Sequence, residues 1–167
     1  MSNEIVNRVA NSVLITFDLE DLYVPGERVK IDLSQWLDQG FVLREKEFRT
    51  AITSFDWSIY KDCYVALFCS TDTILPAWAS LLITAQLNQV ANQIVWGSLQ
   101  DLEHQLFVKA IDELDLSFFE SKPVIVKGCS EKQIPESAFV YLTQKLQPVV
   151  KSLFYGEACS SVPLFKK

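Results

Sequence analysis

The chain has 167 residues, of which 49% are hydrophobic and 22% are charged. This length and composition are those of a globular domain with a sizeable core, and they exclude an intrinsically disordered chain. The net charge of −6, from 21 acidic and 15 basic residues, argues against general binding to nucleic acid or to an anionic membrane, because both need a positive field.

The first residues, MSNEIVNRVAN, lack the apolar core of a signal peptide. The longest apolar run, around Trp78 to Leu87, is interrupted by Ser80, Thr84 and Gln86 and is too polar to span a bilayer. We therefore expect a cytoplasmic protein whose four cysteines are reduced. No CxxC pair occurs, so the paired-cysteine patterns of zinc ribbons and thioredoxins are absent.

Residues 1 to about 60 have the less regular pattern. Here we expect a short helix over 4–11, an extended stretch over 13–19, a strand over 28–33, a short helix over 35–39 capped by Ser34, and a helix over 43–54. The apolar residues of this segment are too scattered to bury a core alone. We therefore expect an irregular α+β segment over residues 1–60 that packs onto residues 61–167 within a single domain.

Strands and helices alternate from residue 64 onward. Continuous apolar runs predict buried strands over 64–68, 93–96 and 123–127. Helical patterns follow over 77–90, 98–114 and 136–155, the last with a kink at Pro148, and a short strand is expected over 163–165. This alternation predicts an α/β fold of three layers, whose short, mostly parallel sheet has the core strand order 2-1-3.

Two of the strand–helix junctions carry the same residue pattern. Cys69-Ser70 follows the strand over 64–68, and Cys129-Ser130 follows the strand over 123–127. Each pair precedes an isoleucine, a proline and an alanine, with one extra residue in the first junction. In the order 2-1-3 both cysteines leave adjacent strands at the carboxyl end of the sheet, where ligands bind in such folds. Each also precedes a helix N-terminus, which favours the thiolate.

A third pair, Cys159-Ser160, lies in the tail, and a chain reversal at Gly156 would bring it to the same place. Three converging thiolates suit zinc or an iron–sulfur cluster. We therefore hypothesise a metal site whose sulfur atoms lie roughly 3.8 Å apart. Its ligands would be Cys69, Cys129 and Cys159, with Ser70, Asp72, Ser130 and Ser160 in support.

A structural role for the cysteines is the alternative, because free cysteine is among the most buried residue types. Cys63, at the start of the first of these strands, is interpreted in this way. His104, the only histidine, lies off the apolar stripe of its helix and is expected to face solvent. Glycine-rich phosphate-binding motifs are absent, so no nucleotide is expected.

The chain also resembles a known protein family along its whole length. The resemblance rests on NEIVNRVANS (3–12), LREKEFR (43–49), FDWSIY (55–60), FCSTDTILPAWA (68–79), VIVKGCSEKQIP (124–135) and YGEACSSVPLFKK (155–167). These segments are similar to an uncharacterised bacterial family named domain of unknown function 2480 (DUF2480). The resemblance implies no activity, but it implies a genetic setting near iron–sulfur cluster assembly and hence a protein partner in that process.

Three kinds of function are compatible with these residues. The first is a metal- or iron–sulfur-related accessory protein that uses Cys69, Cys129 and Cys159. The second is a cysteine-dependent enzyme or sulfur carrier, in which Cys69 or Cys129 is activated by the helix end and assisted by Asp72 or a serine. The third is a protein-binding module with no chemistry, whose exposed aromatic residues recognise a partner. The sequence leaves the substrate and the oligomeric state open.

Overall fold

The computed structural model describes residues 14–128 and 132–167. The chain divides into two compact units. Unit 1 consists of residues up to Val24 and of Leu106–Lys167, and unit 2 is the continuous segment Pro25–Gln105. The helix predicted over residues 4–11 lies outside the described residues, as do Cys129 and Ser130.

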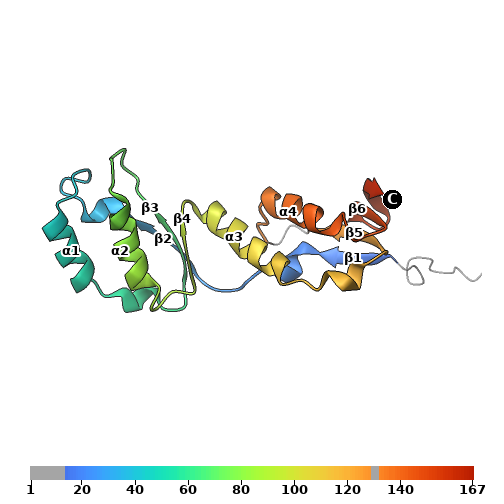
Figure 1. Cartoon of the computed structure of the whole chain (residues 1–167), viewed down its shortest axis with the longest axis horizontal. Helices are drawn as coiled ribbons and strands as arrows, with labels where there is room; N and C mark the ends of the chain where they lie inside the picture. The colour runs from blue at the N-terminus through green and yellow to red at the C-terminus, as the bar shows by residue number, and fades with distance from the viewer. Residues whose placement is uncertain (1–13, 129–131) are drawn as a thin grey trace, which may run out of the picture. The chain divides into compact units, whose positions relative to one another are not determined.

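Unit 2 contains a sheet of three parallel strands in the order β2-β3-β4. These strands are β2 (Arg28–Asp32), β3 (Tyr64–Phe68) and β4 (Gln93–Trp96), and α1 (Glu45–Ser54) and α2 (Ala77–Leu87) connect them (Figure 1). The spatial order of the strands follows the chain order. Two right-handed crossovers in the same direction place both connecting helices on one face of the sheet.

The core of unit 2 lies between this face and the two helices. Ile31, Val65 and Leu67 of the sheet are buried against residues of both helices, namely Phe48, Ile52, Ala79, Ile83 and Leu87. Cys63 belongs to the same cluster and is only 4% exposed, in agreement with the packing role expected for it. Burial, followed by the nearby carboxylates of Glu27 and Asp62, raises the pKa of this thiol.

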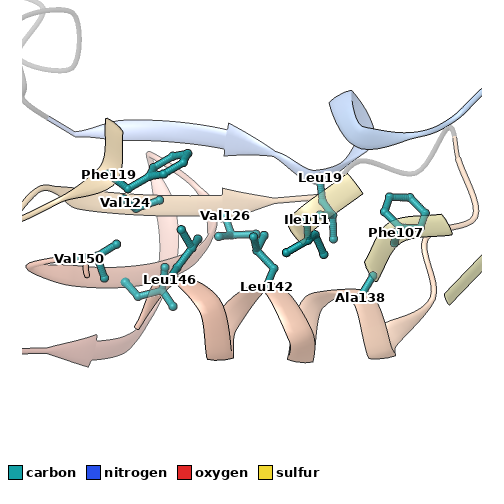
Figure 2. Close-up of a cluster of buried hydrophobic side chains, with 11 residues drawn as sticks. Leu19, Phe107, Ile111, Phe119, Val124, Val126, Ala138, Leu142, Leu146 and Val150 are labelled. Atoms are coloured by element: carbon teal, nitrogen blue, oxygen red, sulfur yellow. The ribbon is translucent and has the colours of Figure 1, made fainter. Parts of the chain in front are cut away.

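Unit 1 contains a sheet of four strands in the order β1-β5-β6-β7. The strands are β1 (Ile15–Asp18), β5 (Pro123–Lys127), β6 (Ser152–Glu157) and β7 (Ser160–Lys166), and α4 (Glu136–Leu146) connects β5 to β6. The first three strands are parallel, and β7 is antiparallel to β6. Figure 2 shows Val126 of β5, Leu142 of α4 and Ile111 meeting in the core of this unit.

Helix α3 (Leu99–Asp112) contains the boundary between the units. It begins with a reciprocal cap, because the backbone N–H of Ser98 donates to Asp101 and the backbone N–H of Asp101 donates to the Ser98 hydroxyl. In unit 2, Glu103 of α3 forms an ion pair of 2.7 Å with Arg28 of β2. His104 is half-buried and its Nδ1 makes no hydrogen bond among the described residues, which corrects the expectation that it faces solvent.

The second half of the chain repeats the first, without a gap, at a spacing of 59 residues. The 3-10 helices η3 (Trp57–Tyr60) and η4 (Leu116–Phe119) begin and end at residues one spacing apart, and the same is true of β3 and β5 and of α2 and α4. Positive φ angles also recur at the equivalent positions Asp62 and Ser121, and again at Gly97 and Gly156. Unit 1 and unit 2 are therefore two versions of one α/β arrangement.

Many core positions carry the same residue in the two versions. Both members are buried in the pairs Phe48/Phe107, Ile52/Ile111, Val65/Val124, Ala79/Ala138 and Leu87/Leu146. The first strands also correspond, because their last residues, Asp18 of β1 and Asp32 of β2, each cap a 3-10 helix, η1 (Leu19–Leu22) or η2 (Leu33–Trp36). The repeat thus follows the packing of the two cores.

The α/β class is confirmed, but the sheet order 2-1-3 is wrong. Strands β3 and β4 are parallel neighbours as predicted, whereas β5 lies in the other sheet beside β1. The partner of β5 comes from the segment that was expected to be irregular. No local pattern reveals this pairing, because it joins residues about 100 positions apart in sequence.

The structure differs from three further expectations about the fold. The helix predicted over 136–155 ends at Leu146, two residues before Pro148, which lacks the backbone N–H that a continued helix would use. The segment Ser152–Glu157, which contains Phe154 and Tyr155, then forms β6. The compact units divide the chain near residues 24 and 105 instead of 60, and the single cooperative domain stays a prediction. The crossover helices of unit 2 share one face instead of covering both.

In the part of the chain that the structure describes, no helix is both long enough and apolar enough to cross a membrane.

Candidate functional site

The carboxyl ends of β2 and β3 form the edge of the unit 2 sheet at which the predicted site residue Cys69 lies. Asp32 and Phe68 are paired at this edge, and Cys69 and Ser70 follow directly after Phe68. In unit 1 the first residue after β5 is Gly128, so the spacing of 59 residues aligns Cys69 with Gly128 and Ser70 with Cys129. The two cysteines therefore do not occupy equivalent positions after their strands.

Asp32 connects the two loops at this edge. Its Oδ1 accepts hydrogen bonds from the backbone N–H of Ser34 at 2.9 Å and of Ser70 at 3.0 Å, and the two serine hydroxyls lie 3.1 Å apart. Partial burial alone raises the pKa of an aspartate, yet the hydrogen bonds from Ser70 and Ser34 hold the pKa of Asp32 at about 2. The carboxylate is consequently ionised at neutral pH and fixes the loop after β3 to the loop after β2.

Cys69 is half-buried and contacts the same loop. Its Sγ lies 3.4 Å from the hydroxyl of Thr71, which donates a hydrogen bond of 2.7 Å to the carbonyl of Gly40. Among the hydrogen bonds of the described residues, the Asp32 carboxylate accepts from two backbone N–H groups at this edge. These bonds hold the two loops together.

The other predicted site residues are not brought together by the described structure. Cys159 is exposed in the two-residue turn between β6 and β7, and Ser160 begins β7. Asp72 is exposed in the loop before α2. Cys129 and Ser130 lie outside the described residues, and Cys69 and Cys159 belong to different units.

The premise of the three-cysteine site is therefore wrong, because β3 and β5 are not adjacent strands. Within residues 14–128 and 132–167 no group of three or more histidine, cysteine, aspartate or glutamate residues is placed to hold a metal ion. The sulfur–sulfur distance of roughly 3.8 Å and the binding of zinc or an iron–sulfur cluster stay predictions.

In unit 1, three lysines are neighbours at the end of the sheet where β5 and β6 begin and β7 ends. The backbone N–H of Lys151 donates to the carbonyl of Lys122 at 2.9 Å, and the backbone N–H of Lys167 donates to the carbonyl of Lys151 at 3.0 Å. Because Pro123 pairs with Ser152, the three lysines extend the sheet register by one position. We call Lys122, Lys151 and Lys167 the lysine row.

The lysine row meets an exposed aromatic ring. The Nζ of Lys122 lies 4.6 Å from the ring centroid of Phe118 and donates to the Phe118 carbonyl at 2.6 Å. The ring is 56% exposed. Lys166, on β7 opposite Ser152, adds another cation beside the row. In the described part of the chain, no carboxylate forms an ion pair with any of these lysines.

Comparison with known proteins adds a family. The chain belongs to the family described as a protein of unknown function (DUF2480), whose model matches residues 3–167. Neither the curated proteins nor the solved structures contain a match to the chain. The match confirms the resemblance seen in the sequence.

The sequence of this DUF2480 chain gives little sign of the lysine row. Its members are separated by long stretches of chain, and Lys151 falls within the helix that was predicted over 136–155. Only the register of β6 between β5 and β7 makes Lys151 the neighbour of Lys122 and Lys167. The Cys-Ser pattern instead predicted a site at the carboxyl ends of the strands.

Proposed function

We propose that this DUF2480 chain is a cytoplasmic, non-enzymatic binding protein whose unit 1 recognises an acidic segment of a protein partner. The observation that carries the proposal is the lysine row, in which like charges are neighbours across three strands. Like charges directly opposite one another destabilise a sheet. The Nζ atoms of Lys122 and Lys167 donate to the carbonyls of Phe118 and Pro148, and a carboxylate-rich ligand would in addition relieve the repulsion among the three cations.

Comparison with the other unit supports this interpretation. The positions equivalent to Lys122 and Lys151 are Cys63, which is buried, and Asn92, whose side-chain amide donates to the carbonyl of Asp62 at 2.7 Å. The same sheet edge thus folds in unit 2 without a cation at either position. The α/β arrangement that the two units share therefore does not require a lysine at either position.

The neighbouring ring defines the partner further. Phe118 is exposed beside Lys122, so the surface offers an apolar contact next to its cations. The net charge of −6 repels long polyanions at a distance. A short peptide with alternating carboxylate and apolar side chains fits the local surface better than a nucleic acid does.

The test uses a fluorescein-labelled peptide of alternating glutamate and leucine, with binding followed by fluorescence anisotropy. We expect binding that weakens as salt is added, because exposed ion pairs are screened. Replacing the lysine row by glutamine (Lys122→Gln, Lys151→Gln and Lys167→Gln together) should weaken binding by roughly tenfold, at about 0.5 kcal/mol for each exposed pair. Phe118→Ala should weaken binding of this peptide more than of one with serine in place of leucine.

The matched control removes the same amount of charge elsewhere on the chain. Lys46, Lys61 and Lys109 are exposed residues of other elements, and replacing all three by glutamine should leave the affinity for the peptide nearly unchanged. An equal loss in this control variant, or no salt-sensitive binding of the peptide, would overturn the proposal. Tighter binding of a labelled single-stranded DNA than of the peptide would overturn it in favour of nucleic acid.

A further inference from the structure

The free edge of the unit 2 sheet differs from its counterpart in unit 1. Strand β6 of unit 1 lies between β5 and β7, whereas the equivalent strand β4 has only β3 beside it among the described residues. The exposed apolar residues near this edge correspond in the two units. They are Leu81 and Trp96 in unit 2, and Val140 and Tyr155 in unit 1.

In unit 1, Tyr155 has neighbours on an additional strand and on the adjacent helix. Tyr155 is opposite Val162 of β7, and its ring packs edge-on against Phe139 of α4 at 5.7 Å between centroids. In unit 2, Ser80 stands at the position of Phe139, and Trp96 remains 56% exposed. Unit 2 therefore has the strand edge and the apolar side chains but, among the described residues, no strand in the position that β7 occupies in unit 1.

The free edge also lacks the features that normally keep strand edges apart. Residues 73–100, which include all of α2 and β4, contain no lysine, arginine, aspartate or glutamate, although 22% of the whole chain is charged. Proteins usually protect an exposed edge strand with charge, proline or a bulge. The cores of protein interfaces are likewise depleted in charge. No charged side chain of residues 73–100 therefore opposes the approach of a second copy of this surface.

The backbone of β4 determines how a second copy would fit. The N–H of Gly97 donates to the carbonyl of Leu67 on β3 at 2.9 Å. The backbone N–H and C=O groups of successive residues in a strand point to alternate sides. Those of Val95, like those of Gly97, therefore face β3, whereas those of Ile94 and Trp96 face the free edge. A β4 strand of a second copy, antiparallel to the first, can then pair Ile94 of each copy with Trp96 of the other. Each of these two pairs exchanges two backbone hydrogen bonds, and the two-fold axis passes at Val95.

We propose that two copies of this chain associate along β4 in this register and join their three-stranded sheets into one continuous sheet. Helix α2 packs over β3 and β4, because its buried residues share a cluster with Val65, Leu67 and Ile94. With strands about 4.8 Å apart, the two α2 helices then lie about 10 Å from each other, which is an ordinary helix-packing distance. Leu81, 64% exposed on α2, is covered in this arrangement together with Trp96.

The size of this surface sets the expected strength. A tryptophan side chain buries at most about 250 Å², so the exposed part of Trp96 contributes roughly 140 Å². With Leu81 and the strand edge, the interface remains near the lower end of the range for specific complexes. We therefore expect a dimer that dissociates in the micromolar range.

The first experiment is sedimentation equilibrium of the full chain over a series of concentrations. The wild type should change from monomer to dimer, and Trp96→Lys should shift the dissociation constant upward by at least tenfold. Ile59→Lys is the matched control, because Ile59 is an equally exposed apolar residue of unit 2 on η3. A wild type that is monomeric at all concentrations, or equal effects of the two variants, would refute the dimer.

A second experiment tests the register. Residues at the axis of a non-hydrogen-bonded antiparallel pair have Cα atoms about 4.5 Å apart, within disulfide range. In a chain whose Cys69, Cys129 and Cys159 are replaced by serine, Val95→Cys should form a covalent dimer on mild oxidation, and Ile59→Cys should not. A dimer by sedimentation without this cross-link would overturn the register. Binding of the acidic peptide by unit 1 should be unchanged in Trp96→Lys, so each proposal can fail without the other.

Discussion

Replacing Asp32 by asparagine tests how much the carboxylate–serine network contributes to unit 2. The substitution preserves the size of the side chain and one acceptor oxygen, but it removes the charge that accepts the N–H groups of Ser34 and Ser70. A folded-state pKa of about 2, against an ordinary value of 3.8, corresponds to about 2.4 kcal/mol. Because the group is partly solvated, we expect a loss of about 1–2 kcal/mol at pH 7.

The dependence on pH distinguishes the charge from other effects of the substitution. The pKa of Asp32 is lowered in the folded state, so the unfolded chain takes up the proton first as the pH falls. The stabilisation is therefore complete above about pH 5 and is lost progressively toward pH 2. The difference in the free energy of unfolding between the wild type and Asp32→Asn should shrink over that range.

Urea unfolding followed by tryptophan fluorescence is the appropriate assay. All four tryptophans lie within Pro25–Gln105, so their fluorescence reports the unfolding of unit 2. Asp56→Asn is the matched control, because exposed Asp56 caps η3 through Ser58 alone and connects no second strand. A deficit of Asp32→Asn that is the same at pH 7 and pH 3, or no larger than that of the control, would contradict the role assigned to the network.

The other predictions concern the lysine row, a glycine and the cysteines. Lys151→Glu should stabilise the protein by about 0.5 kcal/mol, seen as a higher midpoint of thermal unfolding by circular dichroism, because it replaces repulsion across the strands with attraction; a lower midpoint would contradict the register. Gly97→Ala should cost about 1–3 kcal/mol in urea unfolding, since φ is +145° and a Cβ would lie 2.6 Å from the Asp101 carboxylate. Gly40→Ala, with φ +84° and its nearest neighbour, the Thr71 methyl group, 4.0 Å from the added Cβ, should cost less. Cys159 should react rapidly with a thiol reagent in the native protein and Cys63 only after unfolding, as mass spectrometry would show; rapid native labelling of Cys63 would contradict its burial. The three-cysteine hypothesis predicts stoichiometric zinc or iron that falls on Cys69→Ser, and equal metal content in both proteins by elemental analysis would refute it.

The sequence predicted individual elements better than their partners. Strands β3, β4 and β5 were predicted to the residue, because continuous apolar runs between turn residues mark strands buried on both faces. The error at β6 arose because Leu142, Leu146 and Leu153 have helical spacing on both sides of Pro148. Pairing of β1 with β5 could not be predicted, since parallel strands distant in sequence share no local signal.

The candidate site shows the same limit. Cys69 was correctly placed after β3. The comparison of the two Cys-Ser pairs allowed one extra residue in the first junction, whereas the gapless spacing of 59 aligns Cys129 with Ser70 and not with Cys69. Asp32 was not considered, because its role depends on β2 lying beside β3. The repeat at a spacing of 59 is visible in the sequence through its matched phenylalanine, isoleucine and proline residues.

Unit 2 lies in the sequence between the two parts of unit 1, and this order has a consequence during synthesis. Strand β1 leaves the ribosome early, yet its neighbour β5 follows about 100 residues later, after all of unit 2. At ordinary elongation rates of 5–20 residues per second, β1 waits roughly 5–20 s for its partner. Unit 2 is continuous in sequence and can complete its sheet during this interval. Nascent chains of this protein therefore pass through a period in which one folded unit is attached to an unpaired strand, and a chaperone that binds extended apolar segments has its opportunity at residues 15–18.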